Sequence, residues 1–118
     1  MEQIVWSNIA RLSLKDIWDF YAEKSTPAAD KIIEEIISAA ESISYKDQYQ
    51  VEELLGEEFR RAVVRHFKVI YRVHEDHLRI IDVFDARQNP NTLKNKSLWW
   101  ITNFLEYYYK LNYKVNWY

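Results

Sequence analysis

The 118-residue sequence has no cysteine, one methionine, two prolines and a single glycine. Without cysteine the chain forms no disulfide, holds no thiolate-ligated zinc and performs no thiol catalysis. The absence of cysteine also agrees with a reducing compartment. The only glycine, Gly56, lies in a polar and acidic stretch, residues 45–58, which we expect to be an exposed connector between regular elements.

The sequence also shows no pattern typical of a secretory signal or a membrane-spanning helix. Residues 1–6 contain no basic segment followed by an apolar one, as a secretory signal would. The most apolar stretch near the C-terminus, residues 98–109, is too short to cross a bilayer, which takes roughly 20 apolar residues. We therefore expect a cytoplasmic protein with no membrane partner.

A net charge of -2 conceals a strong asymmetry along the chain. Residues 1–58 carry five Lys and Arg against thirteen Asp and Glu, whereas residues 59–87 carry seven against four and residues 88–118 carry four against one. The basic half could contact nucleic acid or an acidic protein. It could equally pair with the acidic helices of its own domain. The length itself fits one domain.

The N-terminal part predicts a strand and then a helix. Residues 4–6, Ile-Val-Trp, are β-branched and aromatic, which favours a strand. Ser7 or Asn8 can cap a helix that we expect to end near Glu23. Its apolar stripe consists of Ala10, Leu14, Ile17 and Tyr21.

A second helix is expected to begin directly after the first. Thr26 can accept hydrogen bonds from the free amides, Pro27 suits the first helical position, and helical spacing continues to about Ser44. The short link predicts an antiparallel helical hairpin packed on one face of a sheet. Its apolar positions are Ala29, Ile32, Ile33, Ile36, Ala40 and Ile43.

Three strands are expected in the basic half, at residues 59–65, 67–74 and 78–85. In the middle strand apolar residues alternate with Lys68, Ile70 and Arg72, so one face is apolar and the other carries two cations. The expected fold class is α+β: an N-terminal strand, a two-helix hairpin and a three-stranded antiparallel meander in one twisted sheet.

These elements resemble the RelE/ParE superfamily of type II toxin–antitoxin toxins, also known as plasmid stabilisation proteins. The resemblance covers residues 2–94, and it implies a bacterial toxin domain at residues 1–94 that is neutralised by a cognate antitoxin whose C-terminal segment wraps it. Besides the Ile-Val-Trp strand and the spacing of the first helix, it rests on Gln50-Val51-Glu52-Glu53-Leu54-Leu55, Phe67-Lys68-Val69-Ile70-Tyr71 and Asp82-Val83-Phe84-Asp85-Ala86-Arg87-Gln88-Asn89-Pro90.

The superfamily has two modes of action. RelE-like members cleave mRNA on the ribosome, whereas ParE-like members poison DNA gyrase and have no nuclease activity. We expect a toxin that arrests growth in the ParE-like way, through a protein target such as gyrase and without a cofactor. The alternatives are a metal-independent, RelE-like endoribonuclease and a degenerate module that only binds antitoxin.

RNA cleavage by the 2′-hydroxyl needs a base, an acid and cations around the phosphate. The resemblance places Lys68 and Arg87 where cleaving members carry arginines, with Arg65 close by. The position of their C-terminal tyrosine falls near Leu93, which cannot transfer a proton. His66 could serve instead, because imidazole titrates near neutrality, although a histidine in a turn is more often simply solvated.

Four further arginines are expected to be surface charges or antitoxin contacts. The chain could form a homodimer or a toxin–antitoxin hetero-oligomer. These partner-binding candidates are Arg60, Arg61, Arg72 and Arg79.

The other titratable residues have structural explanations. His74 and His77 flank Asp76 at metal-ligand spacing, but a turn between two strands accounts for them, and we expect no metal site. Asp82 and Asp85 should point to opposite faces of their strand, and Asp85 should pair with a neighbouring arginine.

The C-terminal segment, residues 95–118, has a composition of its own. Nine of its 24 residues are aromatic and four are asparagine. A stripe of Trp99, Phe104 and Tyr108 could close over the sheet, mediate a dimer contact or stack on bases. The segment could also be an extension without a selected role, as its Asn/Lys/Tyr bias suits AT-rich coding sequence.

Overall fold

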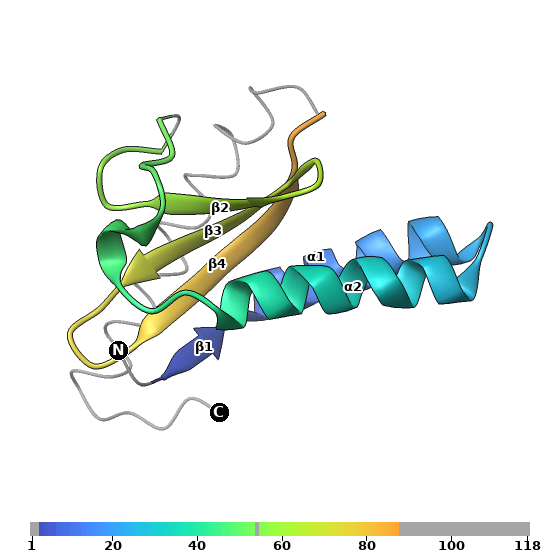
Figure 1. The fold of residues 1–118 in the computed structure, drawn as a ribbon, viewed down its shortest axis with the longest axis horizontal. Helices are drawn as coiled ribbons and strands as arrows, with labels where there is room; N and C mark the ends of the chain where they lie inside the picture. The colour runs from blue at the N-terminus through green and yellow to red at the C-terminus, as the bar shows by residue number, and fades with distance from the viewer. Residues whose placement is uncertain (1–2, 54, 88–118) are drawn as a thin grey trace.

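The computed structural model describes residues 3–53 and 55–87, which form an α+β domain (Figure 1). The order of elements agrees with the sequence prediction, and each strand boundary lies within two residues of the expected one. In chain order the elements are β1 (Ile4–Trp6), α1 (Asn8–Ala22), α2 (Thr26–Glu41), the 3₁₀ helix η1 (Lys46–Gln48), β2 (Arg60–Val64), β3 (Phe67–Val73) and β4 (Leu78–Asp85).

The four strands form one sheet in the order β1-β4-β3-β2. Strands β2, β3 and β4 are an antiparallel meander, whereas β1 lies parallel to β4. A parallel neighbour requires a long crossover, and the helical hairpin together with the first two meander strands provides it. The β3–β4 register shifts between Ile70, opposite Asp82, and Tyr71, opposite Ile80, so Ile81 is the extra residue of a bulge.

Ser7 joins β1 to α1. Its side chain accepts a hydrogen bond from the Ala10 amide at 3.0 Å, as an N-cap does. Its hydroxyl also donates to the Ile81 carbonyl at 2.7 Å, and its amide donates to the Ile80 carbonyl at 3.0 Å. One buried serine therefore begins the helix and fixes it to the central strand β4.

Helix α2 begins one residue earlier than predicted and ends sooner. The capping side chain is Ser25, which accepts from the Ala28 amide at 3.2 Å, and Thr26 is already helical. Both residues have a hydroxyl that could cap the helix, so the sequence alone did not separate them. The helix ends at Glu41 rather than near Ser44, with Ser42 as the C-cap, whose hydroxyl donates to the Ser38 carbonyl at 2.7 Å.

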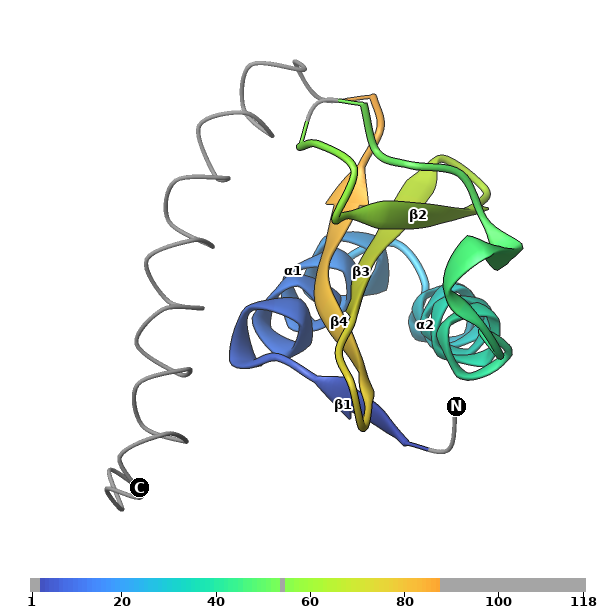
Figure 2. The ribbon, with the colours of Figure 1, turned by 90° about the vertical axis from the view of Figure 1, so that its left-hand side faces the viewer.

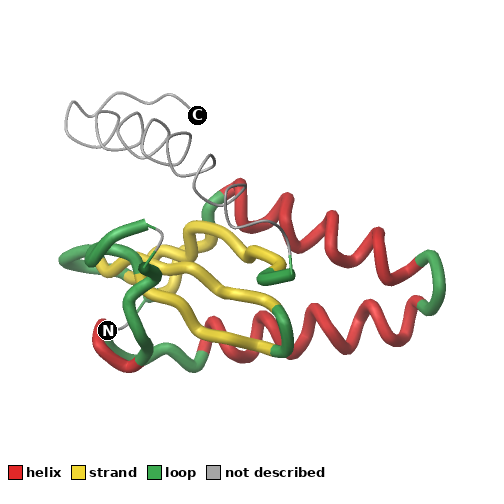
Figure 3. Tube along the Cα trace, turned by 90° about the horizontal axis from the view of Figure 1, so that it is seen from above, coloured by secondary structure: helices red, strands yellow, loops and turns green. Residues whose placement is uncertain are grey.

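The two helices lie antiparallel and extend beyond the end of the sheet (Figure 3). Helix α1 contacts β4, and helix α2 contacts β2 and β3. Figure 2, which looks nearly along the helices, shows α1 beside β4 and α2 on the side of β2 and β3. The predicted stripes of both helices meet the sheet in the main core. Its buried members are Ala10, Ile32, Ile36, Ala40, Ile43, Ala62, Phe67, Val69, Tyr71, Leu78, Ile80 and Val83.

A second, smaller core contains four buried residues, Phe59, Ile70, Ile81 and Phe84. Ile70 lies between Lys68 and Arg72 on the strand face that the sequence predicted to be cationic. That face is therefore partly apolar, and the two cations flank a buried isoleucine.

The connector from α2 to β2 was expected to be exposed, and this expectation is wrong for part of its length. Glu52 is only 1% exposed, and its backbone amide donates to the Phe59 carbonyl at 2.8 Å. The Lys68 ammonium lies 3.0 Å from its Oε2, and Arg61 Nε lies 3.8 Å from the same oxygen. Burial of this carboxylate is tolerated because cations on the sheet pair with it.

Two arginines hold the remainder of the connector. Arg60 pairs with Asp47 at 3.0 Å and donates to the Tyr49 carbonyl at 2.8 Å. Arg72 pairs with Glu58 at 3.2 Å, and its guanidinium lies 5.7 Å from the centre of the Phe59 ring. The connector is thus bound to the sheet along its length by side chains of β2 and β3.

His74 and His77 stack at the turn between β3 and β4. Their ring centres are 4.6 Å apart with planes inclined by 10°, and His77 Nδ1 lies 2.7 Å from the carboxylate of Asp76. Burial lowers the pKa of His74 to about 4, and the nearby charges of His77, Arg72 and Arg79 act in the same direction. His74 is therefore neutral in the folded protein near neutral pH.

The predicted aromatic segment, residues 95–118, and the position of Leu93 lie outside the described residues. Among the helices that are described, none combines the length and apolarity needed to cross a bilayer.

Replacing Glu52 with alanine should lower the free energy of unfolding by about 3 kcal/mol, because the change leaves Lys68 and Arg61 without their shared carboxylate and frees the connector. Urea denaturation followed by circular dichroism measures the loss. The matched control is Glu53→Ala, at an exposed neighbouring carboxylate, which should change stability by less than about 0.5 kcal/mol. Equal effects of the two substitutions would show that the buried pair contributes nothing.

Stability should fall as the pH drops from about 6.5 to about 4. The unfolded chain protonates His74 near pH 6.5 and the folded chain only near pH 4, so acid favours unfolding across that window. The difference corresponds to at most about 3 kcal/mol, reduced by solvent screening. His74→Phe should flatten the decline. Urea midpoints at each pH test this, and parallel curves for both proteins would contradict it.

Candidate functional site

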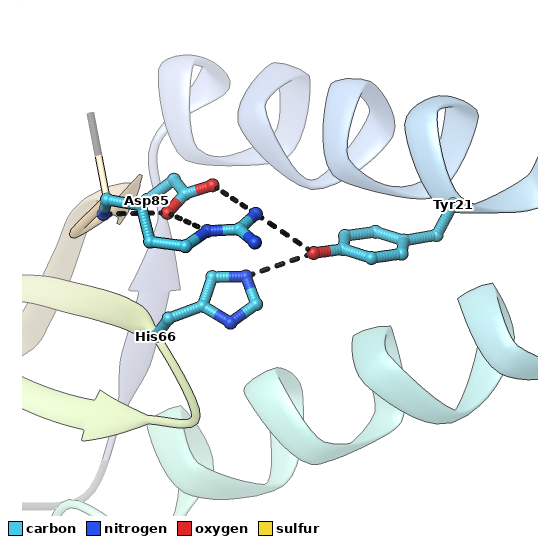
Figure 4. A network of polar contacts seen from close by, with 4 residues as sticks. Tyr21, His66 and Asp85 are labelled. Carbon is cyan, nitrogen blue, oxygen red and sulfur yellow. Dashed lines mark hydrogen bonds and ion pairs between the residues drawn. The ribbon is translucent and has the colours of Figure 1, made fainter.

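Four polar side chains converge where the C-terminal half of α1 meets the end of β4 (Figure 4). The Tyr21 hydroxyl lies 3.0 Å from His66 Nε2 and 3.2 Å from Arg87 Nη2. Arg87 also forms a two-point contact with Asp85, at 2.9 Å through Nη2 and 3.2 Å through Nε. We call Tyr21, His66, Asp85 and Arg87 the tyrosine network.

A tight turn brings His66 to this place. Val64 and Phe67 pair across β2 and β3, so Arg65 and His66 alone form the loop, and Arg65 has a left-handed φ of 54°. The His66 carbonyl accepts a hydrogen bond from the Ala86 amide at 2.7 Å. That bond holds the end of β4 against the turn, which positions Arg87 beside the histidine.

Within the tyrosine network, Asp85 and Arg87 neutralise each other's charge. Hydrogen bonds from the Arg87 side chain are the main reason that the pKa of Asp85 lies below its usual value, and the same contact raises the pKa of Arg87. Asp85 therefore stays ionised and holds the guanidinium in a fixed orientation. This confirms the expectation that Asp85 pairs with a neighbouring arginine.

A pocket of about 270 Å³ opens beside the network. Buried Phe67 and partly buried Ile17 give it an apolar base, and Phe20 and Tyr21 meet edge to face, with ring centres 5.1 Å apart. The residues that line it are Asp16, Ile17, Phe20, Tyr21, Phe67, Asp85 and Arg87.

The structure does not bring all four nuclease candidates together. Arg87 and His66 share the tyrosine network, whereas Arg65 points to α2 and pairs with Glu35 at 2.5 Å. Lys68 follows Phe67 on β3, so it points to the opposite sheet face, where it pairs with Glu52. The catalytic roles of these residues remain predictions.

The partner-binding candidates are mostly occupied within the chain. Arg60, Arg61 and Arg72 hold the connector, as described above. Arg79 lies opposite Arg72 on β3 and opposite Val5 on β1. An antitoxin contact at these arginines remains a prediction.

Sequence reasoning missed two residues that organise this half of the molecule. Tyr21 was assigned to the apolar stripe of α1, and its ring does pack on the core while its hydroxyl joins the network. Glu52 was placed in an exposed loop. A tyrosine that ends an apolar stripe is amphipathic, and this was the only available signal for its polar role.

Asp82 is separate from the network: it accepts a hydrogen bond from Ser13 of α1 and one from the Val83 amide at 2.7 Å. Within the described residues, no group of three or more histidine, aspartate or glutamate side chains is arranged to hold a metal ion.

Comparisons with known proteins agree with this fold. A solved structure described as the chromosomal ParDE TA system from P. aeruginosa matches with a TM-score of 0.65 and 19% sequence identity, over 74% of this chain and 98% of that chain. A search of curated proteins found no match. The family model for the ParE toxin of the type II toxin–antitoxin system parDE matches residues 4–90. The chain therefore belongs to the ParE toxin family of type II toxin–antitoxin systems.

Proposed function

We propose that this toxin arrests bacterial growth by binding a protein target such as DNA gyrase, without cleaving RNA, and that a cognate antitoxin neutralises it. Family membership supports a toxin with an antitoxin partner. The choice of a protein target is supported by the way the candidate cations are used.

Each cation that a nuclease would direct at a phosphate is paired with a carboxylate of the same chain. Lys68 pairs with buried Glu52, Arg65 with Glu35 and Arg87 with Asp85. A cation neutralised in this way stabilises the added negative charge of a phosphorane transition state less than a free one does. This pairing is the observation that carries the proposal.

One observation favours the second candidate, a ribosome-dependent endoribonuclease. Catalysis by proton transfer requires a titratable group, which the position near Leu93 does not provide. The Tyr21 hydroxyl, between His66 Nε2 and Arg87 Nη2, is such a group. In this alternative the phenol and the imidazole exchange protons with the RNA, and Lys68 takes no part.

Expression of the chain alone in a bacterial host should stop growth, and co-expression of the small protein encoded beside it should restore growth. With a protein target such as gyrase, the purified toxin should inhibit DNA supercoiling by gyrase while cellular mRNA remains intact. Normal growth at verified soluble expression would favour the degenerate module. Arrest with active gyrase and new mRNA ends, found by primer extension, would favour the nuclease.

If RNA is cleaved, Tyr21→Phe should reduce the cleavage rate about 10²–10⁴-fold, because it removes the transferable proton and keeps the ring. Tyr45→Phe provides the control, since Tyr45 is an exposed tyrosine that does not line the pocket beside the network. Primer extension on ribosome-bound mRNA measures both variants. Full cleavage by Tyr21→Phe would place the chemistry elsewhere.

A further inference from the structure

We propose that the pocket beside the tyrosine network receives an arginine or lysine side chain from a helical segment of the cognate antitoxin. The inference rests on the proposed function, because it presumes that a neutralising antitoxin exists. It adds the place of contact and the chemistry of the contacting residue.

The size of the pocket fits one long side chain. Pockets that hold whole small molecules measure roughly 300–1,000 Å³, and this one measures about 270 Å³. The apolar base of Ile17 and Phe67 and the neighbouring ring of Phe20 can pack against an alkyl stem. The aromatic faces also attract a cationic head.

The charge of the lining selects a cation. The lining contains two carboxylates, Asp16 and Asp85, and one guanidinium, Arg87. Arg87 engages both oxygens of Asp85, so this pair is satisfied. Asp16 is exposed, and among the described residues no hydrogen bond or ion pair reaches its carboxylate. An incoming guanidinium or ammonium group would give Asp16 a close ion pair, which no described residue provides.

The pocket continues into an exposed stripe along α1. Leu12, Asp16 and Phe20 are spaced four residues apart, so they lie on one helix face, and Leu12 and Phe20 are 61% and 62% exposed. Two large apolar side chains on either side of a carboxylate form a surface that an amphipathic helix can cover, with its cation between two apolar residues.

The acidity of this half of the chain argues for a basic protein segment and against nucleic acid. Residues 1–58 carry five basic and thirteen acidic side chains. A phosphate backbone would be repelled by Asp16 and by the surrounding helical carboxylates, whereas a basic segment would be attracted.

The test measures the affinity of the full-length toxin for its antitoxin, the small adjacent protein, once that protein has been shown to neutralise toxicity. Asp16→Lys should raise the Kd about tenfold or more, because it places like charges in contact. The matched control Glu34→Lys makes the same charge change at an exposed site on α2, outside the pocket lining, and should alter the Kd by less than about threefold. Replacing the contacting antitoxin cation with glutamate should restore affinity for Asp16→Lys.

Three results would overturn the proposal. Equal Kd values for Asp16→Lys and Glu34→Lys would show that the pocket takes no antitoxin cation. Loss of toxicity with unchanged antitoxin affinity would assign the pocket to the target. A much lower melting temperature for free Asp16→Lys than for Glu34→Lys, with unchanged affinity, would show that Asp16 stabilises the toxin itself and does not bind the antitoxin. Absence of any neutralising neighbour would defeat the proposed function instead.

Discussion

The buried carboxylate of Glu52 is the constraint on which much of this fold depends. A carboxylate that is 1% exposed is tolerated only when cations reach it, and Lys68 and Arg61 do so from β3 and β2. The connector is therefore bound to the sheet, and both cations turn away from solvent. A residue that looks like a nucleic-acid contact in the sequence is, in the folded chain, the counter-ion of a structural acid.

Because these cations are paired within the chain, the fold of the family does not by itself determine the mode of action. A helical hairpin on a twisted sheet is compatible with either mode of action, so the fold alone does not choose between them. The choice depends on which side chains remain available. Lys68 is used by the connector and Arg65 by α2, while Arg87 and His66 gather around a tyrosine beside an open pocket. On this side of the molecule, Tyr21 is the residue that contacts both His66 and Arg87.

Period and turn signals predicted the elements well because those signals are local. The alternation in β3 and the stripe of α1 follow directly from strand and helix geometry. The sequence could not choose between Ser25 and Thr26 as helix cap, since both can accept the same bond. It also could not show that Glu52 is buried or that Tyr21 meets Arg87, 66 positions later. Such contacts depend on how the elements pack, which no spacing in the chain encodes.

The charge asymmetry of the sequence is largely resolved inside the domain. Among the described residues, each long-range ion pair joins an acid from the first half to a cation from the second, as in Arg65 with Glu35, Arg60 with Asp47 and Lys68 with Glu52. The sheet thereby loses most of the basic character that its composition suggests. The first half has more acids than these pairs neutralise, and Asp16, exposed on α1, forms no ion pair with a described residue. Within the described residues, the α1 face that carries Leu12, Asp16 and Phe20 is acidic and apolar, so electrostatics there favours a basic protein segment over RNA.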